Sequence, residues 1–390
     1  MSAATRPDSP GADAEAPAVL TLDAGGTKLT FSAIAANREI VVPITLPARG
    51  DDLAVCLAQI VAGFTRIRAA VGARATAISF AFPGPADYPT GVIGDLPNLP
   101  AFRGGVALGP LLEERFGLPV FLNNDGDLFA YGEALFGLLP EVNRSLAEAG
   151  SPKRFRNLLG VTLGTGFGGG IVRDGELFLG DNSASGEVWL LRNKLDVGCF
   201  AEEGVSLRAV RRAYARETGS TLEESPEPKE IAAIAEGRAP GDAAAAREAF
   251  RRLGEVAGDA IANALTLVDG LVVVGGGLAG AAAHFLPALV GELNGRLKNL
   301  GGGEVPRLVV SAYNLEDARE RERFLVGQAR EIAVPGSLRQ VRYDPEKRTG
   351  VGLSRLGTSH AVALGAAAFA LRKLAAGHDY CARGVSSDAR

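Results

Sequence analysis

One aspartate, Asp125, lies where an α/β protein can carry out proton transfer. The stretch from Leu118 to Asp127 opens with a short apolar run, Pro119 to Leu122, and ends in asparagines, aspartates and a glycine. Ligands of open α/β sheets bind at the carboxyl ends of strands, so Asp125 is our candidate general base. A plain turn is the alternative, because Asn, Asp and Gly supply the backbone conformations that turns require.

Two glycine-rich turns are candidates for holding phosphate groups. The first lies between two apolar runs and contains Gly25 and Gly26, followed by Thr27 and Lys28. Glycine lets turn amides approach an anion closely, while threonine and lysine add a hydroxyl donor and a positive charge. An ordinary Gly-Gly hairpin with a solvated lysine is the alternative.

The second turn, Gly164 to Gly170, has five glycines in seven residues and again lies between two apolar runs. Successive exposed amides in such a segment form an anion pocket. The segment is not a P-loop, because no Gly-Lys-Ser/Thr ends it and a strand follows where a helix should begin.

A third glycine run, Gly275 to Gly280, matches the G-x-G-x-x-G fingerprint of dinucleotide-binding proteins. That fingerprint is normally followed, about 20 positions later, by an acidic residue that ends a second strand. The nearest acid here, Glu292, lies in a helical stretch. A dinucleotide-dependent oxidoreductase is therefore only a remote alternative.

Polar side chains in three loops suit a ligand with many hydroxyl groups. Asn98 lies between two prolines in the run Leu96 to Pro100, and Glu187 and Glu202 lie in loops beyond the second glycine turn. Each carboxylate can accept several hydroxyl hydrogen bonds. For any one of these residues taken alone, a solvated loop position is the commoner explanation.

Apolar periodicity predicts the elements that must position these residues. Strands are predicted at 18–22, 29–35, 75–82, 158–163 and 271–274, and helices at 51–71, 108–116, 129–136, 250–268 and 359–374. Residues 139–158 are predicted to be a polar loop, and the highly charged segment 314–350 has no clear pattern.

Composition predicts a soluble protein of about two domains, since the chain has 390 residues and 47% of them are hydrophobic. Lys plus Arg is 41 against 45 for Asp plus Glu, and no basic cluster stands out, so we expect no nucleic acid partner. Three separated cysteines fit a reducing compartment. We see no signal sequence and no apolar run of about 18 residues, which predicts a cytoplasmic protein without a membrane partner.

The order of these motifs resembles the ROK family of the actin-like ATPase and sugar kinase superfamily, which contains glucokinases, fructokinases, other hexose and hexosamine kinases, and transcriptional repressors. The resemblance runs from about Val19 to about Leu374. The matching motifs are Leu22 to Lys28, Pro83-Gly84-Pro85, Pro97 to Pro100, Asn124-Asp125, Leu163 to Gly170, Gly186-Glu187, Gly198-Cys199, Val274 to Gly277 and Leu364 to Ala367.

The resemblance implies a two-domain, actin-like ATPase (ribonuclease H-like) α/β fold with a central cleft. It also implies a kinase that uses ATP and Mg²⁺ to phosphorylate a hydroxyl of a hexose or hexose derivative, commonly as a homodimer or homotetramer. The expected parts are a disordered tail (1–17), a smaller domain (18–136 with 358–376), a larger domain (137–357) with a charged insertion (314–350), and a C-terminal tail (377–390).

The resemblance also assigns roles to individual residues. Asp125 would take the proton of the attacking hydroxyl, and Asp23 would help to hold Mg²⁺ through water. ATP would contact Asp23, Gly25, Gly26, Thr27, Lys28, Gly164, Thr165, Gly166, Gly275, Gly276 and Gly277. The sugar would contact Asn98, Asn124, Asp125, Glu187 and Glu202.

The chain departs from the family at the zinc motif. Family members with this motif carry a histidine three residues after the Gly-Glu pair, where this chain has Leu190, and three further cysteine ligands, of which only Cys199 is present. A structural zinc site takes four ligands, so we expect no zinc. The family acid follows the cysteine by two residues, whereas Glu202 follows by three, which leaves Glu203 as a possible substitute.

A regulator that binds sugar but turns it over slowly or not at all is the main alternative. Against a repressor, only about 18 residues precede the first predicted strand, too few for a helix-turn-helix domain. The net charge of −4 gives no indication of DNA contact.

Overall fold

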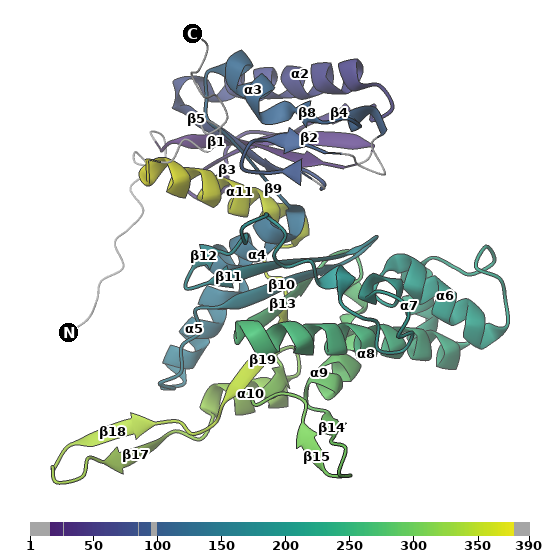
Figure 1. The fold of residues 1–390 in the computed structure, drawn as a ribbon, viewed down its shortest axis with the longest axis vertical. Coiled ribbons are helices and arrows are strands. Elements are labelled where there is room, and N and C mark those ends of the chain that lie inside the picture. The colour runs from purple at the N-terminus through teal and green to yellow at the C-terminus, as the bar shows by residue number, and fades with distance from the viewer. Residues whose placement is uncertain (1–15, 26, 85, 95–99, 378–390) are drawn as a thin grey trace. The chain divides into compact units, whose positions relative to one another are not determined.

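A computed structural model describes residues 16–25, 27–84, 86–94 and 100–377, and Figure 1 shows its elements. The chain forms two compact units, one made of residues up to 128 together with those from 362 onward, and one made of residues 129–361. We call them unit 1 and unit 2. The chain passes between them inside two helices, α4 (Asp125–Phe136) and α11 (Thr358–Ala375). The domain bounds expected from the sequence stay a prediction.

Unit 1 is built on a mixed sheet with the strand order β3-β2-β1-β5-β9, and β4 also pairs with β2. Its strands are β1 (Ala18–Ala24), β2 (Lys28–Ala35), β3 (Arg38–Glu39), β4 (Ile44–Pro47), β5 (Ala75–Ala81) and β9 (Val120–Asn123). The pairs β1–β5 and β5–β9 are parallel, whereas β2 is antiparallel to β1. A small separate sheet joins β6 (Ala86–Asp87), β7 (Val92–Ile93) and β8 (Val106–Ala107).

Helices α2 (Leu53–Val71) and α3 (Leu108–Phe116) cover one face of this sheet, and α11 covers the other (Figure 1). The Asp52 side chain caps the start of α2, and Gly117, with φ of 61°, ends α3 in the left-handed conformation. Phe64 of α2 packs against Phe31 with ring centroids 5.1 Å apart. On the opposite face, Phe121 meets Phe369 of α11.

By length and composition, the helical stretch Leu53–Arg74 is apolar enough to cross a membrane. The expectation that no apolar run reaches that length is therefore wrong. The helix buries Cys56, Ile60, Phe64 and Ile67, at helical spacing, in the core of unit 1. This burial is what a core helix shows.

Unit 2 repeats the same sheet plan, with the strand order β12-β11-β10-β13-β19-β16. Its strands are β10 (Leu158–Leu163), β11 (Phe167–Arg173), β12 (Glu176–Leu177), β13 (Leu271–Gly275), β16 (Ser311–Asn314) and β19 (Arg348–Leu353). As in unit 1, the first two strands form an antiparallel hairpin and the later ones pair in parallel.

The helices of unit 2 are α5 (Leu138–Glu148), α6 (Leu207–Thr218), α7 (Pro228–Ala235), α8 (Ala243–Val268), α9 (Ala282–Leu293) and α10 (Ala318–Val326). Two hairpins, β14 (Arg296–Lys298) with β15 (Glu304–Pro306) and β17 (Arg330–Ala333) with β18 (Gln340–Tyr343), form sheets of their own. The long helix α8 packs against the sheet and also contacts α6, α7 and α9.

Two sequence expectations for unit 2 are wrong. Residues 139–158 are not a loop, because 138–148 form α5, whose Leu138, Leu139, Val142 and Leu146 are buried. The segment 314–350 is not wholly an insertion, since it reaches into β16 at one end and β19 at the other, both strands of the main sheet. The other strands and helices expected from apolar periodicity are confirmed, with shifted ends.

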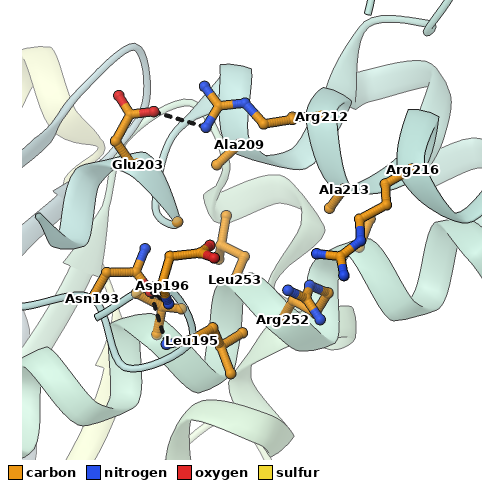
Figure 2. A pocket seen from close by; sticks show the side chains of 13 residues that line it. Asn193, Leu195, Asp196, Glu203, Ala209, Arg212, Ala213, Arg216, Arg252 and Leu253 are labelled. Atoms are coloured by element: carbon orange, nitrogen blue, oxygen red, sulfur yellow. Dashed lines mark hydrogen bonds and ion pairs between the residues drawn. The ribbon is translucent and has the colours of Figure 1, made fainter. Parts of the chain in front are cut away.

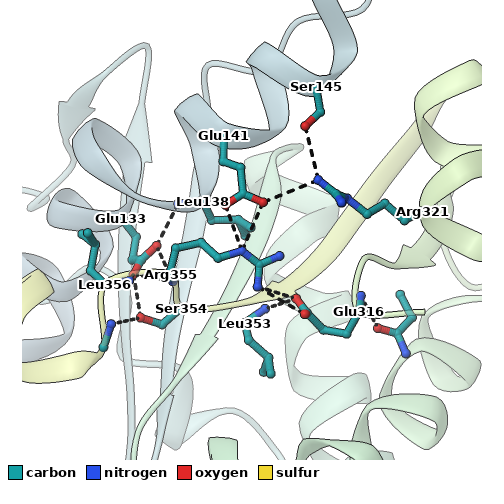
Figure 3. Close-up of polar contacts among 12 residues, drawn as sticks. Glu133, Leu138, Glu141, Ser145, Glu316, Arg321, Leu353, Ser354, Arg355 and Leu356 are labelled. Atoms are coloured by element: carbon teal, nitrogen blue, oxygen red, sulfur yellow. Dashed lines mark hydrogen bonds and ion pairs between the residues drawn. The ribbon is translucent and has the colours of Figure 1, made fainter. Parts of the chain in front are cut away.

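A buried carboxylate in α4 accepts hydrogen bonds from two other segments of unit 2, the start of α5 and the loop before α11. Glu133 of α4 is fully buried and accepts hydrogen bonds from the Leu138 amide at 2.8 Å and the Ser354 hydroxyl at 2.6 Å. It also accepts the amides of Arg355 and Leu356, each at 3.1 Å (Figure 3). The start of α5 and the loop that precedes α11 are thereby tied to α4.

Around this carboxylate, Arg355 forms ion pairs with Glu141 at 3.1 Å and Glu316 at 2.9 Å (Figure 3). These pairs are partly exposed and contribute little by themselves. Next to Glu133, Gly132 packs so closely on Ala361 that a Cβ would clash with the Ala361 carbonyl oxygen. Helices α4 and α11 therefore cross in contact.

We predict that Glu133→Ala lowers the free energy of unfolding by about 3 kcal/mol or more, because it leaves buried donors without an acceptor. Urea denaturation of the full chain measures this. Glu148→Ala, at the exposed end of α5, is the matched control and should change stability by less than about 0.5 kcal/mol. Equal stability of the two variants would contradict this role.

Candidate active site

Asp125 is the first residue of α4, immediately after β9. The Asn124 side-chain oxygen accepts the Gly126 amide at 2.7 Å, and the Leu128 amide donates to the Asn124 carbonyl at 3.1 Å. Asn124 is therefore the N-cap of the helix. The plain-turn alternative is wrong here, because the segment begins a helix three turns long.

Asp125 has a raised pKa. Its residue surface is exposed, yet protein atoms crowd the carboxyl group, and this loss of water raises the pKa above the ordinary aspartate range. The hydrogen bond from the Gly126 amide, at 2.9 Å, lowers the pKa, and the negative charge of Asp23 raises it. The shift toward higher pKa suits a group that must receive a proton.

Asp23 lies at the same edge of the unit 1 sheet. The parallel registers place Asp23 of β1 opposite Ala81 of β5, and Ala81 opposite Asn123 of β9. Because the carboxyl ends of parallel strands share one sheet edge, the two aspartates meet there. Thr27, in the turn after β1, and Lys28, the first residue of β2, are exposed, and the Gly25 amide donates to the Lys28 carbonyl at 2.9 Å. Gly26 lies outside the described residues.

Asn123 is a feature of this edge that the sequence reasoning missed. Its side chain is fully buried, and neither its oxygen nor its nitrogen has a hydrogen-bond partner in the described part of the chain. The Ser79 hydroxyl of the neighbouring strand β5 is also buried without a hydrogen-bond partner in the described part of the chain. Successive side chains of a strand point to opposite faces of the sheet. Since Leu122 lies in the core, this alternation would have placed the Asn123 side chain on the opposite face of the sheet from Leu122.

The glycine turns of unit 2 lie together at one edge of its sheet. The turn Gly164 to Gly166 joins β10 to β11, and the Gly164 amide donates to the Gly166 carbonyl at 3.0 Å. The parallel neighbour β13 ends at Gly275, and Gly276 follows with φ of 89°. The Leu278 amide donates to the Leu163 carbonyl at 3.0 Å, which holds one turn against the other.

These turns leave space and donors at their surface. A Cβ on Gly277 would meet no atom within 4 Å, and one on Gly164 would lie 3.8 Å from the Gly277 nitrogen. Within the described ranges, no acceptor is found for the amides of Thr165, Gly166 and Gly277. Helix α6 starts beside the turn, with the Leu207 amide donating to the Gly164 carbonyl at 2.8 Å. The arrangement suits an anion.

Two acids expected at the sugar are positioned by other residues of unit 2. The Glu202 carboxylate accepts the Phe167 amide at 3.0 Å and lies against Gly166, where a Cβ would be 2.8 Å away. Glu187 follows Gly186, whose φ is 77°, and accepts the indole N–H of Trp189. Glu202 thus lies at the glycine turn. Asn98 lies outside the described residues.

A family model described as the ROK family matches residues 19–317. The chain belongs to the ROK family. An N-acetyl-D-glucosamine kinase from Vibrio parahaemolyticus is 30% identical over 274 residues, which are 66% of this chain and 83% of the relative.

Solved structures of ROK proteins agree with the fold. A glucokinase from Parabacteroides distasonis has 54% sequence identity and a TM-score of 0.84, over 92% of this chain and 98% of that one. A ROK hexokinase from Thermus thermophilus has 21% identity and a TM-score of 0.63, over 91% and 99% of the chains, and supports the fold alone. The predicted family and the actin-like ATPase fold class are confirmed.

We predict that Gly276→Ala destabilises this ROK protein, because the residue has a positive φ and a Cβ would clash with the Leu163 carbonyl oxygen. The loss should be about 2 kcal/mol or more in urea denaturation. Gly280→Ala is the matched control, since nothing lies within 4 Å of a Cβ there, and it should leave stability within about 0.5 kcal/mol. A well-tolerated Gly276→Ala would contradict the described turn.

Proposed function

We propose that this protein transfers the γ-phosphoryl group of ATP to a hydroxyl of a hexose or hexose derivative, with Asp125 as the general base and Mg²⁺ as the metal. Its class, an ATP-dependent carbohydrate kinase, follows from the family and the relatives. The remote alternative of a dinucleotide-dependent oxidoreductase is therefore not retained. The acceptor, the base and the metal are the proposed parts.

The raised pKa of Asp125 at a sheet edge that it shares with Asp23 is the observation that carries the proposal. The carboxylate would accept the proton of the attacking hydroxyl as that oxygen bonds to the γ-phosphorus and ADP leaves. Such proton transfer by a positioned side chain contributes about 10²–10⁴-fold to a rate. The helix cap at Asn124 fixes the backbone of the base.

The carboxylate oxygens at this edge of the unit 1 sheet are suitable ligands for Mg²⁺. In the described part of the chain, no three metal-binding side chains gather into a cluster. Mg²⁺ keeps several waters and is usually held by one or two carboxylates together with substrate phosphates, so Asp23 with water would suffice. When bound, the ion would neutralise charge on the phosphates. Asp23 is exposed and free to accept a water.

The glycine turns of unit 2 fit a nucleotide. Gly164, Thr165 and Gly166 would face phosphate oxygens with their amides, and Gly275, Gly276 and Gly277 would pack against the adenosine. The open space at Gly277 is the kind of surface against which a ligand packs. In unit 1, Gly25, Gly26, Thr27 and Lys28 would contact the phosphates. Phosphoryl transfer depends mainly on such positioning and charge neutralisation.

Glucose is the acceptor that we favour, with N-acetylglucosamine next. The supporting relatives are the glucokinase at 54% identity and the N-acetyl-D-glucosamine kinase at 30% identity. Asn98, Asn124, Asp125, Glu187 and Glu202 would bind the sugar hydroxyls. Leu190, where the family has a histidine, is 58% exposed, and its side chain offers no hydrogen bond.

A sugar-binding regulator with slow turnover stays the second candidate, because Leu190 removes one polar partner from the pocket implied by the family. We also propose a cytoplasmic location, a homodimer or homotetramer, no nucleic acid partner and no structural zinc. These are predictions for purified protein, testable by light scattering and by metal analysis.

We predict ADP release from MgATP that depends on added sugar, measured on a panel of hexoses, hexosamines and N-acetylated sugars. Asp125→Asn should lower kcat by about 10²-fold or more, because the base is lost. Asp51→Asn, an exposed aspartate of the same unit, should match the parent protein. Binding of ATP or sugar without turnover on any panel member would favour the regulator.

We predict an acid limb in the pH profile of kcat/KM that lies above the ordinary aspartate pKa of about 3.9. Activity should fall as the pH drops through the raised pKa of Asp125, because the base is then protonated. A limb at the ordinary aspartate value would argue against this residue as the base.

The raised pKa of Asp125 also determines whether its ionisation stabilises or destabilises the fold. A carboxyl with a raised folded pKa binds its proton more tightly when folded, so ionised Asp125 destabilises the fold above that pKa. Asp125→Asn should therefore be at least as stable as the parent at pH 7 and lose this advantage near pH 3. This control separates loss of chemistry from loss of folding.

A further inference from the structure

A pocket lies in unit 2 between α6 and α8, under the loop from Asn193 to Asp196 (Figure 2). Helix α6 contributes residues at helical spacing from Ala209 to Arg216, and α8 does the same from Ala249 to Val256. The pocket is open to solvent, and the empty space in and above it is about 470 Å³. None of the residues proposed to bind ATP or sugar lines it.

Small side chains create this space. Where the two helices face one another, α6 presents Ala209 and Ala213 and α8 presents Ala249. Helix pairs normally fill such a gap with apolar side chains, because close packing gains dispersion energy. Here Leu195, Leu253 and Val256 line one part of the gap, and Arg212, Arg216 and Arg252 line the rest with charged groups.

Two of the three arginines form no ion pair with a described residue. Arg212 pairs with Glu203 at 2.7 Å, whereas neither Arg216 nor Arg252 forms an ion pair with any described residue. Figure 2 shows the guanidinium groups of Arg216 and Arg252 directed toward each other. Two like charges that face each other repel unless an anion lies between them.

The pocket has one net positive charge, since three guanidinium groups, Arg212, Arg216 and Arg252, stand against two carboxylates, Asp196 and Glu203. Arg252 also lies close enough to Glu248 to lower the pKa of that carboxyl group, which is itself bound by Arg251. The charge at the Arg216 end therefore favours an anion, and the Asp196 end favours groups that donate hydrogen bonds.

Asn193 supplies a second, independent observation. The residue is 1% exposed, and its side-chain oxygen accepts the amides of Leu195 at 2.9 Å and Asp196 at 3.1 Å. The oxygen is thereby fixed. The NH₂ nitrogen of this pocket residue is buried next to Gly204, without an acceptor in the described structure. A buried donor without an acceptor costs about 1–3 kcal/mol, which a ligand oxygen would relieve.

We propose that this pocket binds a phosphate monoester of a small polyhydroxylated molecule. The phosphate lies between Arg216 and Arg252, since the planar guanidinium fork matches phosphate oxygens. The hydroxyl-bearing part lies toward the loop, where the Asn193 NH₂ group donates to a ligand oxygen and the Asp196 carboxylate accepts a ligand hydroxyl. The proposal does not depend on the identity of the sugar that the enzyme phosphorylates.

The test is calorimetric titration of the full chain with glucose 6-phosphate, with inorganic phosphate and with glucose. The Arg216→Gln/Arg252→Gln double variant should bind the ester at least about tenfold more weakly, because charge-assisted hydrogen bonds are lost. Arg251→Gln is the matched control, since this arginine neighbours Arg252 on α8 but does not line the pocket. Kinase turnover without added phosphate ester should be unchanged in all three proteins and reports folding.

The titrations distinguish binding of a sugar phosphate from binding of inorganic phosphate. Tighter binding of the ester than of inorganic phosphate, with the difference removed by Asp196→Asn, supports a sugar phosphate. Equal affinity for both would show recognition of the phosphate group alone and overturns the proposed binding of the hydroxyl-bearing part. Equal binding of the ester by the parent and the double variant overturns the proposal, because any such binding then occurs elsewhere. No saturable binding to the parent overturns it as well.

Discussion

The hydrogen bonds of the buried Glu133 carboxylate constrain the parts of the chain that lead into and out of unit 2. Glu133 is eight residues after the proposed base on the same helix, and its acceptor oxygens fix the start of α5 and the loop before α11. A burial of this kind is tolerated only when every acceptor position finds a donor. The position of α4 within unit 2 is thus specified by polar contacts as well as by packing.

The proposed base, Asp125, is positioned by the N-terminal end of α4. Asn124 directly follows the strand and caps the helix. It accepts one hydrogen bond from the Gly126 amide and one from the Leu128 amide, which fixes the backbone next to Asp125. A site built on the junction of a strand and a helix is more rigid than one on a free loop. The glycine turns of unit 2 achieve rigidity differently, through backbone bonds between neighbouring parallel strands.

Much of the fold and of the candidate site could be predicted, because short stretches of sequence carry the relevant patterns. The apolar runs, the glycine turns and the acid after the 119–122 run fixed the motif order and hence the family. The α5 helix was missed because its buried leucines stand among polar residues, and a count at helical spacing would have found it.

Other parts could not be predicted from local patterns. Strand β19 reads RTGVGL, with a buried arginine and two glycines, and it depends on pairing with β13 and β16. Strand propensity of such a segment is set by its neighbours. The pocket between α6 and α8 likewise depends on which faces of two distant helices meet. Neither feature has a signal within one stretch of sequence.

The two units share one sheet plan, including the turn that follows the first strand. The sheet of each unit begins with a hairpin whose first strand runs into a glycine turn, after Thr21-Leu22-Asp23 in one and Thr162-Leu163-Gly164 in the other. Duplication and fusion of one ancestral half would produce this repetition. At the residue after Thr-Leu, unit 1 has the Asp23 carboxylate, whereas unit 2 has Gly164, which has no side chain. The first turn therefore combines a carboxylate that suits a cation with glycine amides and a lysine that suit phosphate, whereas the second offers mainly backbone amides, which suit an anion.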